Sequence, residues 1–148
     1  MPRRPIPAAL RAARRLVERE LQRPATSDTD DAHHGAALFR AYAATCDNVR
    51  ATMGDDGCDA LFARAYAREN AAHPALKQLR VGKTYDTSLE NVHAGIATHG
   101  AVAATAAVEA LIATLIDILA RLIGEDMAIR IIDHDATHPP GSGGAPSS

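Results

Sequence analysis

Histidine is the reactive residue type that this sequence offers most often, so it is the first place to look for chemistry. His93 and His99 lie six residues apart among small side chains, a spacing that puts them on different faces of a helix. An imidazole held between helices can bind a metal ion or haem, or contact a small ligand. We therefore treat His93 and His99 as candidate ligand residues of a sensor module. The alternative is that both are structural.

His73 starts the stretch HPALKQLR, which resembles the surroundings of the phosphorylated histidine in phosphotransfer domains. Such a histidine must be exposed in the middle of a helix, and Pro74 opposes this because it disfavours helical backbone at the preceding residue. A phosphorelay intermediate that uses His73 stays an alternative. His134 and His138 have the four-residue spacing of a helical metal site, but Pro139 follows directly and favours a solvated tail.

The other motifs that carry chemistry are incomplete. RVGKTYD holds only the last residues of a phosphate-binding loop and lacks the upstream glycine. Acidic clusters such as GDDGCD are too short for a calcium loop, which needs oxygen ligands at fixed positions over twelve residues. Cys46 and Cys58 match no zinc spacing. We predict no cofactor, no metal site and no catalytic residues, and an enzyme is the less favoured class.

Positive charge is concentrated at the start of the chain. Residues 1–24 contain seven arginines and two glutamates, a net charge of +5, and because the whole chain carries −2 the remaining residues carry −7. A basic segment beside an acidic body is typical of a contact surface. The segment has no aromatic side chain to stack on bases, which disfavours nucleic acid. We predict that Arg11, Arg14 and Arg15 bind a protein partner, for which the acidic body of a second copy is one candidate. A solvated helix is the alternative.

The composition favours helix throughout the chain. Hydrophobic residues make up 47% but aromatic residues only 3%, and much of the apolar content is alanine, the strongest helix former. No segment alternates β-branched and polar residues as a strand does. Periodicity and breaker residues predict an all-α bundle of five or six helices. We expect helices at residues 7–23, 30–52, 58–72, 87–98 and 101–133, a short piece after Pro74, and a turn at 53–57.

The segment 101–133 is the most apolar part of the chain. Leu119, Ile123 and Met127 keep helical phase across Gly124, so we predict one continuous C-terminal helix. A break at Gly124 is the alternative. About 33 residues make a rod of roughly 50 Å, longer than the ~40 Å width of a compact domain of this size. The apolar residues also occupy more than one face of this helix.

Excess apolar surface on this helix predicts self-association as a homodimer. The alternative is that the other helices of the chain cover it completely. The predicted interface consists of seven large apolar residues of the segment: Leu111, Leu115, Ile116, Leu119, Leu122, Ile123 and Met127.

Together these features predict a non-enzymatic regulatory or adaptor protein that acts by self-association and by docking an unidentified protein partner. We expect a basic helical arm at 1–24, a bundle domain at 25–133 and a disordered tail rich in Pro, Gly and Ser at 134–148. No membrane span is predicted, because the uncharged stretch 91–108 holds two histidines and many small residues. A cytoplasmic location is expected, and the Ala- and Arg-rich composition suggests a bacterial source.

Overall fold

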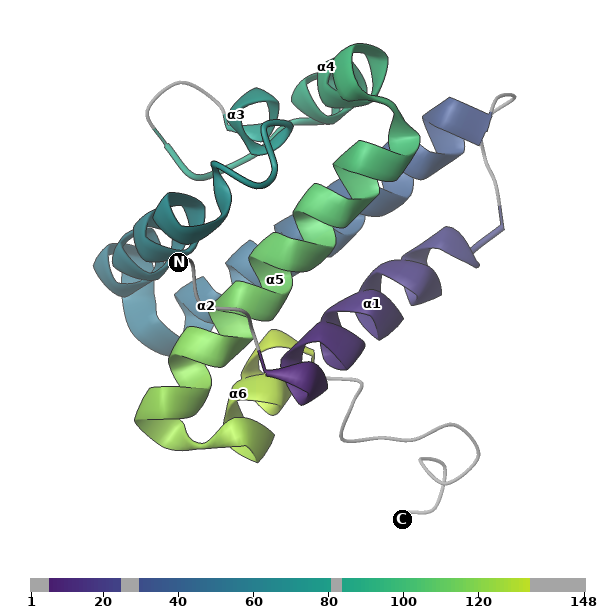
Figure 1. Ribbon diagram of the computed structural model, residues 1–148. Helices are drawn as coiled ribbons and strands as arrows, with labels where there is room; N and C mark the ends of the chain where they lie inside the picture. The colour runs from purple at the N-terminus through teal and green to yellow at the C-terminus, as the bar shows by residue number, and fades with distance from the viewer. Residues whose placement is uncertain (1–5, 25–29, 81–83, 134–148) are drawn as a thin grey trace.

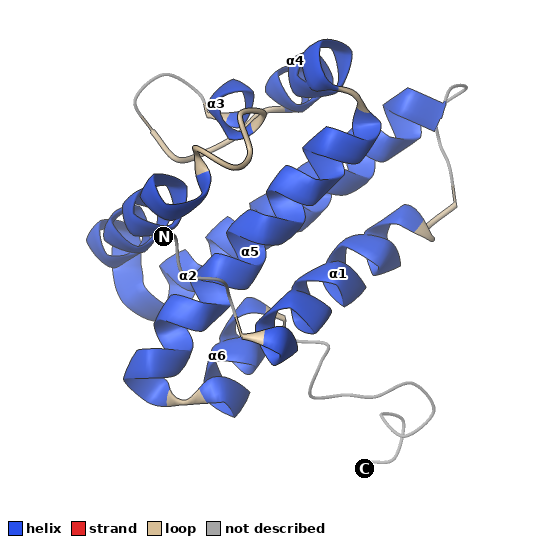
Figure 2. Ribbon diagram, viewed as in Figure 1, coloured by secondary structure: helices blue, strands red, loops and turns tan. Residues whose placement is uncertain are grey.

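Helices account for the regular structure of the chain. The computed structural model describes residues 6–24, 30–80 and 84–133. Within these ranges there is no strand, and the helices are α1 (Pro7–Leu21), α2 (Asp30–Glu69), α3 (Leu76–Leu79), α4 (Leu89–His99), α5 (Ala101–Ile123) and α6 (Glu125–Ile132) (Figure 1, Figure 2). The predicted all-α bundle is confirmed. The tail predicted at 134–148 lies outside the described residues.

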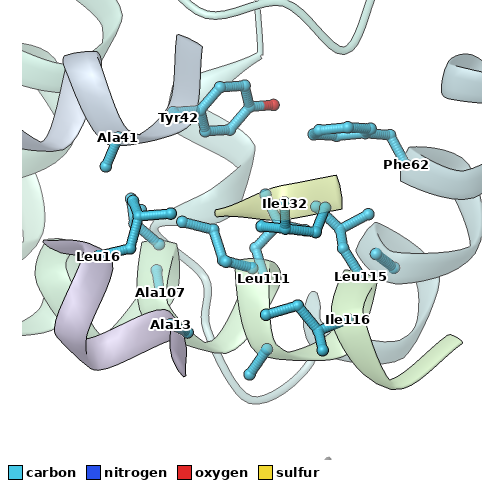
Figure 3. Packing of buried hydrophobic residues seen from close by; sticks show 14 of the residues in the cluster. Ala13, Leu16, Ala41, Tyr42, Phe62, Ala107, Leu111, Leu115, Ile116 and Ile132 are labelled. Atoms are coloured by element: carbon cyan, nitrogen blue, oxygen red, sulfur yellow. The ribbon is translucent and has the colours of Figure 1, made fainter. Parts of the chain in front are cut away.

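α5 is the central helix, and α1, α2, α4 and α6 pack around it (Figure 1). Every residue from 111 to 119 is buried, as expected for a helix that is apolar on all sides and therefore belongs in the interior. Figure 3 shows Leu111 and Leu115 of α5 in one cluster with Leu16 of α1 and Ile132 of α6. The hydrophobic core of the bundle therefore surrounds α5.

By length and composition, α5 is the one helix of the described residues that could cross a membrane. Its most apolar window has a mean hydropathy of 2.0, and 67% of that window is buried inside the bundle. The core helix of a bundle has the same length and composition, so this property does not identify a membrane span. The described helices form no set of membrane-spanning segments.

α2 folds back on itself at Gly54, inside the predicted turn. Gly54 has φ 79° and ψ 175°, which interrupts the helix at this residue. The hydroxyls of Tyr42 and Tyr66 are 2.7 Å apart, although 24 residues of straight helix would separate them by about 36 Å. The first half of α2 runs behind α5 and the second half returns toward α3 (Figure 1). One glycine thus replaces the longer turn that was predicted.

The continuous C-terminal helix predicted over 101–133 is wrong, because the chain turns sharply at Gly124. This residue has φ 91° and ψ 157°, so α5 ends at Ile123 and α6 begins at Glu125. The in-phase pattern across Gly124 was misleading, because α6 buries Ala128 and Ile132 and leaves Met127 exposed. The acidic first turn of α6 also favours a new helix start, since carboxylates stabilise the positive end of a helix dipole.

Gly100 makes a second corner of the same kind, between α4 and α5. Its φ of 91° is positive, which favours glycine, and its ψ of 156° is extended. α4 itself begins with Ser88 as its cap, where Oγ accepts a hydrogen bond from the Asn91 amide at 3.1 Å. The helix predicted at 87–98 therefore corresponds to α4, which begins after Ser88.

α1 packs directly against the bundle. Its buried stripe consists of small and medium side chains: Ala9, Ala12, Ala13, Leu16 and Val17. Alanines allow two helix backbones to approach closely, and α5 meets this stripe with Ala104 and Ala107 among its buried residues. The amide of Ile6, the cap of α1, donates to the Asp117 carboxylate of α5 at 3.4 Å. The basic helix is therefore anchored along its length, and Arg11, Arg14 and Arg15 project from the side opposite this stripe.

Candidate functional site

Three large apolar side chains are exposed together around the turn between α5 and α6. Leu122 is 67% exposed, Ile123 45% and Met127 48%. All three lie within three residues of Gly124, whose backbone turns the two helices apart. We call these three residues the Gly124 corner. An apolar group that the fold leaves in water is a typical feature of a protein contact surface.

Charged side chains of both signs border the Gly124 corner. Arg121 precedes it on α5, and Glu125, Asp126 and Arg130 follow on α6, all of them exposed. An apolar centre with a charged rim is the usual anatomy of a protein–protein interface. The arrangement therefore has the chemistry of a docking surface.

A buried carboxylate one turn below fixes the α5 side of the corner. Asp117 is 1% exposed. Its Oδ2 accepts a hydrogen bond from Arg68 Nη1 at 3.2 Å and forms an ion pair with Arg121 Nη2 at 3.5 Å. Its Oδ1 accepts a hydrogen bond from the Ile6 amide. Three elements of the bundle meet at this side chain, namely α1, α2 and α5. Burying such a charge is unfavourable unless it is paired in this way.

The end of α6 contacts both α1 and α2. Asp133 is buried, and Arg19 Nη2 of α1 lies 2.6 Å from its Oδ1. Asn48 Nδ2 of α2 donates to the Ile132 carbonyl at 2.9 Å. These contacts hold the end of α6 against α1 and α2.

The seven predicted interface residues separate into two groups. Leu111, Leu115, Ile116 and Leu119 are at most 2% exposed and pack inside the chain's own core. Leu122, Ile123 and Met127 are at the surface. The expected contact along the whole helix does not exist in this fold, because α1, α2, α4 and α6 cover α5. Of the seven predicted residues, those left for a partner are the three of the Gly124 corner.

The predicted arginines lie on the solvent side of α1. Arg11, Arg14 and Arg15 are exposed, and their spacing puts them on the face opposite the buried stripe. We call these three residues the α1 outer face. Arg14 acts electrostatically on Glu109 of α5: burial raises the pKa of this carboxyl above its ordinary value, and Arg14 opposes that rise. The α1 outer face therefore combines accessibility with strong positive charge.

The two histidines predicted to bind a ligand lie on α4. His93 is half-buried against Gly35 of α2, so closely that a Cβ at Gly35 would come within 2.5 Å of the imidazole Cε1. His99 is the last residue of α4. The described residues bring together no group of three or more His, Cys, Asp and Glu side chains that could hold a metal ion. His134 and His138 lie outside the described residues. The position of His93 is that of a packing residue between α2 and α4.

His73 lies just beyond the end of α2, and its Nε2 is 3.9 Å from Oε1 of Glu69. Glu69 is itself buried and accepts a hydrogen bond from the Thr114 hydroxyl of α5 at 2.7 Å. A phosphoryl group on this histidine would bring a second negative charge beside that carboxylate, and like charges repel. The geometry therefore disfavours phosphoryl transfer at His73.

An aromatic cluster that sequence reasoning missed joins the two halves of α2 to the segment before α4. Tyr42 donates its hydroxyl hydrogen to the Tyr85 carbonyl and shares a hydrogen bond with the Tyr66 hydroxyl. The Arg80 guanidinium lies 4.3 Å from the centre of the Tyr85 ring. Burial raises the pKa of both Tyr42 and Tyr66 well above the ordinary value. These hydroxyls stay protonated and serve the packing of the bundle.

The two cysteines face each other across the fold of α2. Both are buried, and Cys58 Sγ lies 3.9 Å from the Cys46 carbonyl oxygen. Burial is the largest cause that raises the pKa of both thiols. A thiol reacts as its thiolate, so these side chains are packing groups at neutral pH.

Comparison of the chain with protein-family models, with curated proteins and with solved structures finds no match in any of the three. Function is therefore inferred from the geometry of the Gly124 corner and the α1 outer face.

Proposed function

We propose that this chain is a non-enzymatic adaptor module that self-associates as a homodimer through the Gly124 corner. The observation that carries the proposal is the joint exposure of Leu122, Ile123 and Met127 at one turn. The rest of α5 between residues 111 and 119 is buried. The fold therefore hides large apolar residues of α5, yet it leaves Leu122 and Ile123 at the end of that helix, and Met127 of α6, in water.

Removing the corner from water supplies the driving force for association. Apolar area contributes roughly 25 cal/mol for each Å² that is buried, and in a symmetric dimer each copy contributes its own corner. The area is small beside the ~800 Å² per partner of a standard interface. The proposed homodimer is accordingly a reversible one. An adaptor that must release its partner requires such an equilibrium.

Analytical ultracentrifugation of the full chain over a range of concentrations tests this proposal. The variant Leu122→Gln/Met127→Gln keeps good helix formers in place but replaces two apolar side chains of the corner. We expect its dimer dissociation constant to rise about tenfold or more, because both copies then bury less apolar area when they associate.

Val102→Gln is the matched control. Val102 is 86% exposed, lies on the same helix α5, and stands near the opposite corner at Gly100. This variant should dimerise like the wild type. A wild-type chain that sediments as a single subunit at every accessible concentration would refute the proposal. An equal effect of the two variants would remove the corner's special role.

A further inference from the structure

The start of α1 and the Gly124 corner lie at the same end of the bundle. α1 begins beside the last two turns of α5, since the Ile6 amide bonds to Asp117. α1 also packs on α6, and Arg19 reaches Asp133 at the end of that helix. In Figure 1 the first turn of α1 lies next to α6, close to the turn that joins α5 and α6. The α1 outer face lies further along α1, where Arg14 acts electrostatically on Glu109 of α5.

The α1 outer face and the first turn of α6 carry opposite charges, although Arg121 and Arg130 also border the Gly124 corner. The α1 outer face carries three exposed arginines, Arg11, Arg14 and Arg15. The first turn of α6, at the Gly124 corner, carries the exposed carboxylates of Glu125 and Asp126. Opposite potentials on facing patches favour one docking orientation over others. Arginine also offers three methylene groups below its charged head, and these can pack on an apolar partner.

The area argument leads to the same pairing. The Gly124 corner alone falls well short of the ~800 Å² per partner that a stable interface buries. Corner against corner would offer Glu125 and Asp126 no arginines other than Arg121 and Arg130, which border the same corner. Corner against the α1 outer face adds a second contact area and pairs opposite charges.

We propose that two copies meet about a two-fold axis, with the Gly124 corner of each docked on the α1 outer face of the other. Glu125 and Asp126 of one copy then pair with the arginines of its partner, while Leu122 and Met127 pack on the arginine stems. The two-fold axis repeats this contact, as it does in any isologous dimer. This inference rests on the proposed self-association and names the surface that receives the corner.

Charge reversal tests the pairing. One variant is Arg11→Glu/Arg15→Glu, which leaves Arg14 beside Glu109, and the other is Glu125→Arg/Asp126→Arg. Each variant alone faces like charges in both symmetric contacts, so we expect its homodimer dissociation constant to rise at least about tenfold at low salt. In an equimolar mixture, the α1 outer face of Arg11→Glu/Arg15→Glu meets the Gly124 corner of Glu125→Arg/Asp126→Arg, so that opposite charges face each other. In the second contact of the same heterodimer, the two unchanged surfaces meet.

The mixture should therefore form a heterodimer at concentrations where neither variant dimerises alone, as seen by sedimentation or by energy transfer between labelled chains. Restored association also shows that both variants are folded. If Arg11→Glu/Arg15→Glu dimerises like the wild type while Leu122→Gln/Met127→Gln does not, the corner docks elsewhere and the pairing is wrong, although the proposed function stands. If the mixture fails to associate, the pairing is equally refuted. A monomeric wild type overturns both proposals.

Discussion

Within residues 6–24, 30–80 and 84–133, three glycines turn one helix into the next without a connecting loop. Gly54, Gly100 and Gly124 have φ between 79° and 91° with extended ψ, a combination that is essentially restricted to glycine. At each of these positions an added Cβ would meet no neighbouring atom within 4 Å. The requirement for glycine is therefore a matter of backbone conformation alone.

Gly124→Ala should lower the free energy of unfolding by about 1–3 kcal/mol, the usual cost of a side chain in a disfavoured backbone region. Urea denaturation followed by circular dichroism measures this change. Gly95→Ala is the control, because Gly95 lies inside α4 and an added Cβ would make only ordinary contacts at 3.6 Å and beyond. Alanine is the better helix former, so this control should be neutral or stabilised. Equal stability of Gly124→Ala and wild type would contradict the turn described at this residue.

The elements themselves could largely be predicted, because alanine-rich periodic segments between breakers dictate helices. The helix expected at 7–23 is α1, Pro7–Leu21, and the one expected at 87–98 is α4, Leu89–His99. Gly124 was missed because a glycine inside an apolar helical pattern costs only about 1 kcal/mol when the helix continues. Whether it continues depends on tertiary contacts such as Arg19 with Asp133, which sequence periodicity does not contain.

The candidate site could be predicted only in part for the same reason. Composition identified the apolar segment and the arginines, but burial decides which residues remain for a partner. Leu115 and Leu122 are equivalent in the sequence pattern, yet one is fully buried and the other 67% exposed. The difference arises because the other helices cover α5 only as far as its last turn. No local signal in the sequence marks that limit.

Packing between elements depends on Asp117, where α1, α2 and α5 meet. Asp117→Asn removes the negative charge that Arg68 and Arg121 contact. Removing one partner of a buried pair is strongly destabilising, so we expect a loss of about 3 kcal/mol in the free energy of unfolding, measured by urea denaturation.

Arg121→Gln is the control for Asp117→Asn, because it removes only one of the contacts of Asp117. The Arg121 side chain is 39% exposed and its contact with Asp117 is the longer one, so its loss should cost less than about 1 kcal/mol. If Asp117→Asn is no more destabilising than Arg121→Gln, the carboxylate does not hold the three helices together.

At the scale of the whole molecule, burial of protonated acids makes the fold sensitive to alkali. Tyr42, Tyr66, Cys46 and Cys58 all have pKa values raised in the folded state, with burial as the largest cause. Unfolding exposes them, and their pKa values return to the ordinary 10.0 for tyrosine and 9.0 for cysteine. Above those values the unfolded chain releases protons that the folded chain retains, so stability is full below them and falls as the pH rises.

The free energy of unfolding, measured by urea denaturation, should therefore begin to decline near pH 9 and decline more steeply above pH 10. The decline should reach up to about 1.4 kcal/mol per pH unit for each group that titrates. The sequence contains only two lysines, Lys77 and Lys83, so few other groups titrate in this range. At neutral pH, Tyr42→Phe should lower the free energy of unfolding by about 1 kcal/mol, because the variant lacks the hydrogen bonds of the Tyr42 hydroxyl. This variant should follow the wild-type decline near pH 9, where the thiols titrate, but decline less above pH 10. Parallel curves at every pH would show that the Tyr42 hydroxyl does not control alkaline unfolding, because removing the group would then leave the proton balance of unfolding unchanged.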